Sequence, residues 1–310
     1  MKLVFCGTPQ FAVPSLKALA EAGCDVCLVV TQPDRPQGRG MEMAASPVKQ
    51  TAVALGLPIL QPDKIKKNEE FRQQLTELAP DAIVVVGYGR IVPPWMLELP
   101  PLGNINLHAS LLPKYRGAAP IQWAIAQGET VTGVTTMRID EGLDTGDILL
   151  QEKIEIHPED TAVTLAPRLA EPGAALLVET LRGLEKGSIH PVPQDNTQAT
   201  LAPILKKEDG QIDFSRTATE IHNRLRGFQP WPGAYTVFRG KNLKVIAARP
   251  AAEPVTIPAG ELEVRGEHLF AGCGGAALEL LQIQPEGKKP MTAREFITGY
   301  RPGRRDLLPE

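Results

Sequence analysis

The residues best suited to chemistry begin with Asn106 and His108, which stand two positions apart in NINLHAS. The apolar neighbours Ile105 and Leu107 predict a short strand, and side chains two residues apart on a strand share one face. In a parallel sheet, the carboxyl end of such a strand is where ligands bind. The alternative is an asparagine and a histidine whose polar atoms are satisfied by backbone groups at a strand end.

A second polar segment, IDEGLDTGDILL, holds acidic residues around two glycines. Asp144 lies in its tight turn between apolar strands, so its carboxylate can point back into a cleft. A surface turn is the alternative, and the ligand spacing does not match a calcium-binding EF-hand. Asn106, His108 and Asp144 together suit acyl transfer without a nucleophilic serine or cysteine. The histidine would be the acid or base, the aspartate would orient and charge it, and the asparagine would donate a hydrogen bond to an oxyanion.

Other kinds of site are disfavoured. Cys24 and Cys27 form a C-x-x-C with no second pair to complete a zinc site, so we expect reduced, partly buried thiols and no metal. The first turn, GTPQFA, has a single glycine, whereas a dinucleotide pyrophosphate needs several. No stretch approaches the roughly 18 to 20 apolar residues of a membrane helix, so no membrane partner is expected.

The elements that must position these residues alternate along the first part of the chain. KLVFC, DVCLVV and DAIVVV are continuous apolar strand signals, and segments between them, such as NEEFRQQLTELAP, have helical periodicity. Buried strands separated by helices predict a parallel sheet covered on both faces. The expected fold class is therefore α/β, doubly wound.

The rest of the chain has a different pattern. Residues 189–205 contain three prolines and no apolar period, which predicts a linker. After a helix over TATEIHNRLRGF, short strand signals recur about every ten residues, which is typical of a small β-barrel or sandwich. We expect a catalytic domain over 1–188, a linker over 189–205 and a C-terminal β domain over 206–310.

The motifs around the three polar residues resemble the formyltransferase family that uses 10-formyltetrahydrofolate. NINLHASLLPKYRGAAPIQWAI followed by DEGLDTGDIL is similar to that family in the order of Asn-x-His, SLLP, RGAAP and LDTG. FCGTPQFAVPSL, TQPDRPQGRG, VVVGYGRIVP, KKEDGQIDF, RGFQPWPGAYT and LQIQPEGKKPM narrow the resemblance to members that act on methionyl-tRNA. It covers nearly the whole chain.

The resemblance implies a Rossmann-like front domain and a small, OB-like C-terminal β-barrel that grips tRNA. It implies 10-formyltetrahydrofolate as formyl donor, the amine of initiator methionyl-tRNA as acceptor, and a monomeric cytoplasmic enzyme of translation initiation that needs no metal. The matching positions are the catalytic Asn106, His108 and Asp144, the folate-binding Ser110, Leu111, Leu112 and Pro113, and Arg39, which faces the acceptor end of the tRNA.

Charge is divided unevenly along the chain. The formal net charge is −3, yet residues 206–310 carry 16 Lys and Arg against 13 Asp and Glu. This mild positive balance fits a polyanionic partner. Arg39, Lys206, Lys207, Arg304 and Arg305 are candidate phosphate contacts.

The chain departs from the family pattern at two places. Met41-Glu42 stands where relatives carry lysines, which weakens the expected hold of that loop on RNA. Pro172 stands where a helix former is usual, so a helix is expected to start or kink there.

Three alternatives remain: a formyltransferase acting on a sugar amine or a purine precursor, a formyltetrahydrofolate hydrolase, and a non-catalytic RNA-binding protein. RGFQPWPGAYT and the basic C-terminal part favour tRNA.

Overall fold

The computed structural model describes residues 1–37, 42–253, 256–303 and 306–309. It forms two compact units. The first unit comprises 1–120, 131–155 and 166–203, and the second comprises 121–130, 156–165 and 204–310. Most of the proline-rich segment 189–205 therefore packs with the first unit. The functional domain boundaries expected at residues 188 and 206 stay predictions.

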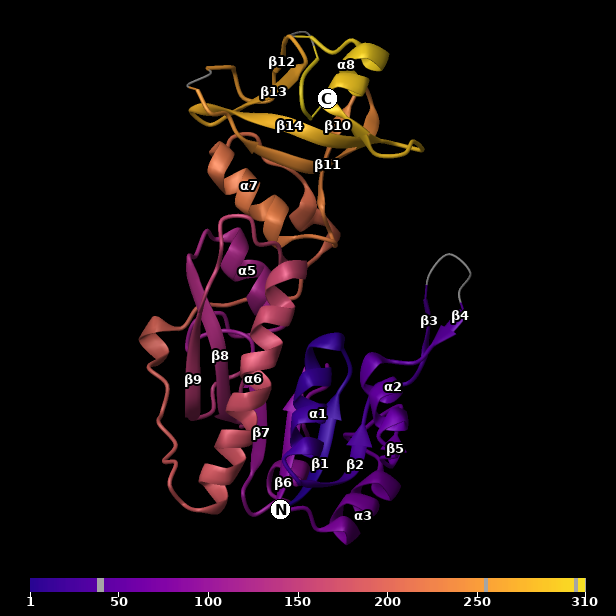
Figure 1. Ribbon diagram of the computed structural model, residues 1–310, viewed down its shortest axis with the longest axis vertical. Coiled ribbons are helices and arrows are strands. Elements are labelled where there is room, and N and C mark those ends of the chain that lie inside the picture. Colours follow the sequence, from indigo (N-terminus) through magenta and orange to yellow (C-terminus); the bar gives the residue numbers. More distant parts are fainter. Residues whose placement is uncertain (38–41, 254–255, 304–305, 310) are drawn as a thin grey trace. The chain divides into compact units, whose positions relative to one another are not determined.

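The first unit is built on a seven-stranded sheet (Figure 1). The strand order is β5 (Ile59–Leu60), β2 (Asp25–Val30), β1 (Lys2–Gly7), β6 (Ala82–Val86), β7 (Asn104–His108), β8 (Val131–Arg138) and β9 (Ile148–Glu155). The first five strands are parallel, which confirms the doubly wound α/β prediction. The last two are antiparallel and form a hairpin that needs no crossover helix. Its loop carries Asp144.

Helices cover both faces of this sheet, as α1 (Val13–Glu21), α2 (Pro47–Ala54), α3 (Glu69–Leu78), α4 (Pro94–Leu97) and α6 (Ala162–Glu185). Two of them begin where capping residues predict: Ser46 accepts a hydrogen bond from Lys49 N at 3.1 Å, and Asn68 accepts one from Phe71 N at 3.0 Å. Phe71 of α3 and Met96 of α4 share a buried cluster with residues of β1, β2 and β6.

The long helix α6 runs through Pro167 and Pro172. The expected start at Pro172 is therefore wrong, since the helix begins ten residues earlier, at Ala162. Gly173 explains the close packing after that proline, because a Cβ there would lie 2.9 Å from a methyl of Leu107 in β7. None of the helices in the described ranges is long and apolar enough to cross a membrane.

The loop that carries Arg39 is flanked by two short strands that pair with each other. β3 (Arg35–Gln37) pairs antiparallel with β4 (Glu42–Ala44). Arg39 and Met41 lie outside the described residues.

The second unit holds α5 (Pro120–Ala126), α7 (Ala218–Gly227), α8 (Ala293–Tyr300) and an antiparallel sheet. The sheet runs β10 (Ala234–Phe238), β11 (Lys241–Pro250), β14 (Ala276–Pro285), β13 (His268–Cys273) and β12 (Leu262–Arg265), with β15 (Met291–Thr292) beside β14. Three short 3₁₀ helices are also present in the described residues. The first unit holds η1 (Gln10–Ala12) and η2 (Asn196–Gln198), and the second holds η3 (Lys207–Gly210). The predicted C-terminal β domain is confirmed. Its sheet is antiparallel, and β10 and β12 are not paired with each other in the described residues.

Two family motifs meet inside this unit. Trp123, from RGAAPIQWAI, packs edge-on against Phe228, from RGFQPWPGAYT, with ring centroids 5.2 Å apart. The Arg224 guanidinium lies 4.8 Å from the Phe228 ring. A Cβ on Gly227 would lie 2.5 Å from the Gln122 carbonyl, so only glycine allows this approach. Both motifs therefore join α5 to α7.

One buried carboxylate, Glu279 of β14, contacts an arginine and a histidine on the two neighbouring strands. Its oxygens accept from Arg249 Nε at 2.7 Å and lie 2.6 Å from His268 Nδ1. Burial alone would raise the pKa of Glu279, but the hydrogen bonds from Arg249 and His268 lower it on balance. The ionised form is therefore favoured in the folded protein.

Candidate active site

The strand β7 brings the first two predicted residues to the carboxyl edge of the sheet. Its burial pattern and alternation place Asn106 and His108 on one face, as predicted, and Leu107 on the other, against α6. The Asn106 side chain is half-buried and has no hydrogen-bond partner among the residues that the structure describes. Its amide is therefore available to a ligand.

His108 is held by one ring nitrogen and faces a carboxylate with the other. Nε2 lies 2.9 Å from the Tyr115 carbonyl oxygen, which can only accept, so Nε2 carries a hydrogen. Nδ1 lies 3.7 Å from Asp144 Oδ2, longer than a hydrogen bond. The His108 and Asp144 side chains are only 7% and 19% exposed. Nδ1 is thus the nitrogen that can take up or deliver a proton.

The loop between β8 and β9 aims Asp144 at this histidine. Asp144 has a left-handed backbone with φ of 52°. Its Oδ2 accepts from Gly117 N at 2.8 Å. Gly117 itself has φ of 124°, and a Cβ there would lie 2.6 Å from the Ala202 carbonyl oxygen. The Arg-Gly step of RGAAP therefore admits a close backbone approach and turns an N–H toward the carboxylate.

A residue that the sequence did not indicate also holds this loop. Gln194 donates through Nε2 to the carbonyl oxygens of Asp144 at 2.9 Å and Gly146 at 2.7 Å. Its Oε1 accepts from the Arg116 guanidinium at 2.7 Å. Gln194 comes from the segment predicted to be a linker, whose lack of period hid its role. The only sequence signal for a role of Gln194 was its position, after two prolines and before the acidic Asp195.

The segment after β7, Ser110 to Pro113, is fixed by hydrogen bonds to the sheet. Thr135 Oγ1 donates to the Ser110 carbonyl at 2.6 Å and accepts from Leu112 N at 3.2 Å. Gln151 Nε2 donates to the Leu112 carbonyl at 2.9 Å. The Ser110 and Leu112 side chains are buried. Leu111 and Pro113 are half-buried and so are open to a ligand, together with the Asn106 amide.

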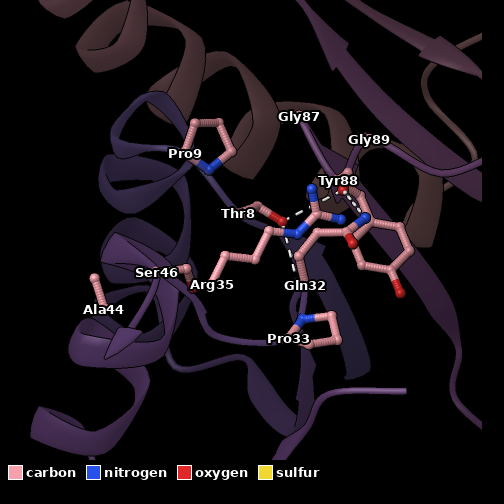
Figure 2. Close-up of a pocket in the computed structure, with 10 residues that line it drawn as sticks. All are labelled: Thr8, Pro9, Gln32, Pro33, Arg35, Ala44, Ser46, Gly87, Tyr88 and Gly89. Atoms are coloured by element: carbon pink, nitrogen blue, oxygen red, sulfur yellow. Dashed lines mark hydrogen bonds between the residues drawn. The ribbon is translucent and has the colours of Figure 1, made fainter. Parts of the chain in front are cut away.

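A pocket of about 370 Å³ opens at the same edge of the sheet. Figure 2 shows its ten lining residues, which follow β1, β2 and β6 or belong to the β3–β4 hairpin, except for Ser46, which caps α2. Thr8 Oγ1 and Gln32 Nε2 both donate to the Tyr88 carbonyl, at 3.3 and 3.1 Å. The exposed Arg35 guanidinium points toward Thr8 and Tyr88. Because β6 is the neighbour of β7, the pocket lies one strand from His108.

Of the candidate phosphate contacts beyond the site, two lie within the described residues. Lys206 and Lys207 are exposed at the start of η3. Arg39, Arg304 and Arg305 lie outside the described residues. Cys24 and Cys27 are free, half-buried thiols. Within the described ranges no group of three His, Cys, Asp or Glu side chains is arranged to hold a metal.

Comparison with known proteins decides the family. The formyl transferase family matches residues 1–181, and the C-terminal domain of formyl transferases matches residues 204–301. The chain belongs to the formyl transferase family. It is 68% identical over 309 residues to the methionyl-tRNA formyltransferase of Koribacter versatilis, which covers 99% of this chain and 98% of the relative. The corresponding protein of Acidobacterium capsulatum is 63% identical over 300 residues, with 96% of each chain covered. The family resemblance of the motifs in this formyltransferase is thus confirmed.

Solved structures show the same fold. An N-formyltransferase from Helicobacter canadensis, in complex with folinic acid and dTDP-3-aminofucose, aligns with a TM-score of 0.68 and 22% identity over 92% of this chain and 99% of its own. A phosphoribosylglycinamide formyltransferase from Bacillus halodurans aligns with a TM-score of 0.50 and 30% identity over 59% of this chain and 95% of its own.

Proposed function

We propose that this formyltransferase moves the formyl group of 10-formyltetrahydrofolate to the α-amino group of initiator methionyl-tRNA, at Asn106, His108 and Asp144. The observation that carries the proposal is the His108–Asp144 pair at 3.7 Å beside the Asn106 amide, which has no hydrogen-bond partner within the described part of the chain. High identity to methionyl-tRNA formyltransferases along the whole chain supports the acceptor.

The proposed step forms a bond between the amine nitrogen and the formyl carbon and breaks the bond from that carbon to the folate N10. The amine loses a proton and N10 gains one. As negative charge grows on the formyl oxygen, the Asn106 amide donates a hydrogen bond to it. Protonated Nδ1 of His108 adds a second donor, and the Asp144 carboxylate stabilises that imidazolium.

Two neighbouring surfaces would hold the substrates. We assign the folate to the segment Ser110–Pro113, where the accessible Leu111 and Pro113 lie next to the Asn106 strand. The methionyl end of the acceptor would occupy the 370 Å³ pocket, whose volume suits a small ligand. Arg35 has no hydrogen bond or ion pair within the described residues, so its guanidinium can pair with a phosphate of the terminal nucleotide.

A formylation assay with three acceptors, and a fourth reaction without any acceptor, tests the reaction. With 10-formyltetrahydrofolate as donor, we expect transfer to methionyl initiator tRNA and none to a sugar amine or to glycinamide ribonucleotide. Formate release without any acceptor should be negligible. Preferred transfer to either small amine, or release of formate at the same rate without tRNA, contradicts the proposal. Asn106→Ala should retain donor affinity within a few-fold and lose about 10²–10³ in kcat, as removal of an oxyanion donor does.

The tRNA contacts are tested by salt dependence. Each phosphate neutralised adds about −0.7 to −0.9 to the slope of log K against log salt. Arg39→Ala and the double change Lys206→Ala, Lys207→Ala should each flatten that slope while leaving folate affinity unchanged. Arg39→Ala should also lower kcat, because an ordered acceptor end aids the transition state. A wild-type slope and kcat in Arg39→Ala would refute its assigned contact.

We further propose that the protein is a cytoplasmic monomer. Sedimentation of the purified chain would test the monomeric state.

A further inference from the structure

A chain of hydrogen bonds runs from a buried cation to the backbone that carries Asp144. The Arg116 guanidinium donates from Nε and Nη2 to Gln194 Oε1, at 3.1 and 2.7 Å. Gln194 Nε2 donates onward to the carbonyls of Asp144 at 2.9 Å and Gly146 at 2.7 Å. A guanidinium only donates and a carbonyl only accepts, so the orientation of the Gln194 amide is fixed at both ends.

The cation at the start of this chain cannot easily swing away. Arg116 is 7% exposed, and its partners are the neutral oxygens of Gln194 and Asn196, the latter at 2.8 Å. It forms no ion pair with any residue in the described ranges. The backbone beside it is bonded to the same distant segment, since Arg116 N donates to the Thr200 carbonyl at 2.9 Å. The donor end of the chain is therefore rigid.

The loop that receives these bonds needs an outside brace. Its own bonds centre on Asp140, which accepts from Gly142 N and from Thr145 Oγ1. Those bonds do not reach the carbonyl of Asp144, whose left-handed backbone, with φ of 52°, is unfavourable for a residue with a side chain. Gln194 bonds that carbonyl directly.

We propose that Gln194 is a positioning residue for catalysis: it fixes the Asp144 backbone so that the carboxylate stays directed at His108 Nδ1. This inference rests on the proposed catalytic role of Asp144. Both ends of the Gln194 amide are bonded within the protein, so its loss should act on turnover through the placement of Asp144. A misplacement of about 1 Å near reacting groups can cost about 10²-fold in rate.

Two substitutions at one position separate positioning from simple support of Arg116. Gln194→Glu keeps an acceptor for the guanidinium but cannot donate to the two loop carbonyls. Gln194→Ala loses both contacts. We expect kcat to fall about 10- to 100-fold in both variants, with KM for donor and tRNA within about threefold of wild type. Gln198→Ala is the matched control, because among the described residues the exposed Gln198 side chain bonds only Asp195. It should leave kcat and KM unchanged.

A double-mutant cycle with Asp144→Asn completes the test. If Gln194 acts through Asp144, adding Gln194→Glu to Asp144→Asn should lower kcat by less than about threefold further. Wild-type kcat in Gln194→Glu, or fully multiplicative losses in the double variant, would overturn the proposal. Full activity of Asp144→Asn alone would refute the role of Asp144 and with it the need for a positioning residue. Thermal unfolding of each variant shows whether Gln194→Ala merely unfolds, in which case Gln194→Glu, with Arg116 still paired, decides.

Discussion

Replacing Asp144 by asparagine removes a charge and little else. Asparagine keeps the shape and can still accept from Gly117 N, which in the native protein is 2.8 Å from Oδ2. What disappears is the attraction between a carboxylate and the His108 imidazolium that forms during transfer. The variant therefore isolates electrostatic stabilisation from the geometry of the loop.

The size of the loss follows from the 3.7 Å separation of His108 Nδ1 and Asp144 Oδ2. Coulomb's law gives about 4.5 kcal/mol at an effective dielectric constant near 20 and about 1.1 kcal/mol in bulk water. At about 1.36 kcal/mol per tenfold, these limits are about 2000-fold and about sevenfold in rate. Both side chains are mostly buried, so we expect kcat to fall about 10²- to 10³-fold, nearer the upper limit.

The assay is single-turnover formylation of methionyl-tRNA with saturating donor, which reports the chemical step. Asp147→Asn, the same change three residues away in the same loop, is the control and should behave as wild type. A single-turnover rate constant for Asp144→Asn within threefold of wild type would refute the electrostatic argument. An equal loss of rate in Asp147→Asn would contradict the assignment of Asp144 as the catalytic carboxylate.

Three further outcomes are expected. Gly117→Ala should unfold at lower temperature and lose most activity, because its Cβ would lie 2.6 Å from a carbonyl oxygen; a wild-type melting curve would contradict this. A thiol reagent should label the half-buried Cys24 and Cys27 before the buried thiols, since burial raises the pKa of Cys273 to about 11; mass spectrometry of partially labelled protein would show the order. The lowered pKa of Glu279 stabilises the fold above the unfolded-state pKa near 4.5, and this contribution is lost as the pH falls through the folded-state pKa. Glu279→Gln should therefore weaken the dependence of unfolding free energy on pH in that acid range, and an unchanged dependence in urea titrations would count against it.

Sequence reasoning reached the parts of the site that local patterns encode. Alternation in NINLHAS predicted that Asn106 and His108 share a face, because a strand has a fixed period of two. The choice of Asp144 came from its place in a tight turn and from the family resemblance. Its assigned catalytic role, like that of the other two, remains a proposal.

The supporting contacts were beyond that kind of reasoning. Gln194 binds carbonyls 50 and 48 residues earlier in the chain, and backbone carbonyls carry no residue-specific signal. The apolar strands predicted on either side of Asp144 are confirmed as β8 and β9, but local patterns did not indicate that they pair antiparallel with each other and with β7. The folate-binding role of Ser110 stays a prediction, and the structure adds that its hydroxyl donates to the Lys114 carbonyl at 2.6 Å inside the loop. Composition alone cannot tell such an internal brace from a ligand contact.

The path of residues 190–203 across the first unit limits how this enzyme can be divided. Val192 pairs with Ile148, and Ala202 donates to the Arg116 carbonyl at 2.7 Å. A chimaera joined after residue 181, where the N-terminal family match ends, would import this strip from a different parent and mismatch it to the Asp144 loop. A junction after Pro203 would keep the loop and its brace from a single ancestor. The part of the chain that must come from one parent is thus longer than the catalytic motifs. Recombination between distant homologues should be tolerated best at junctions after Pro203.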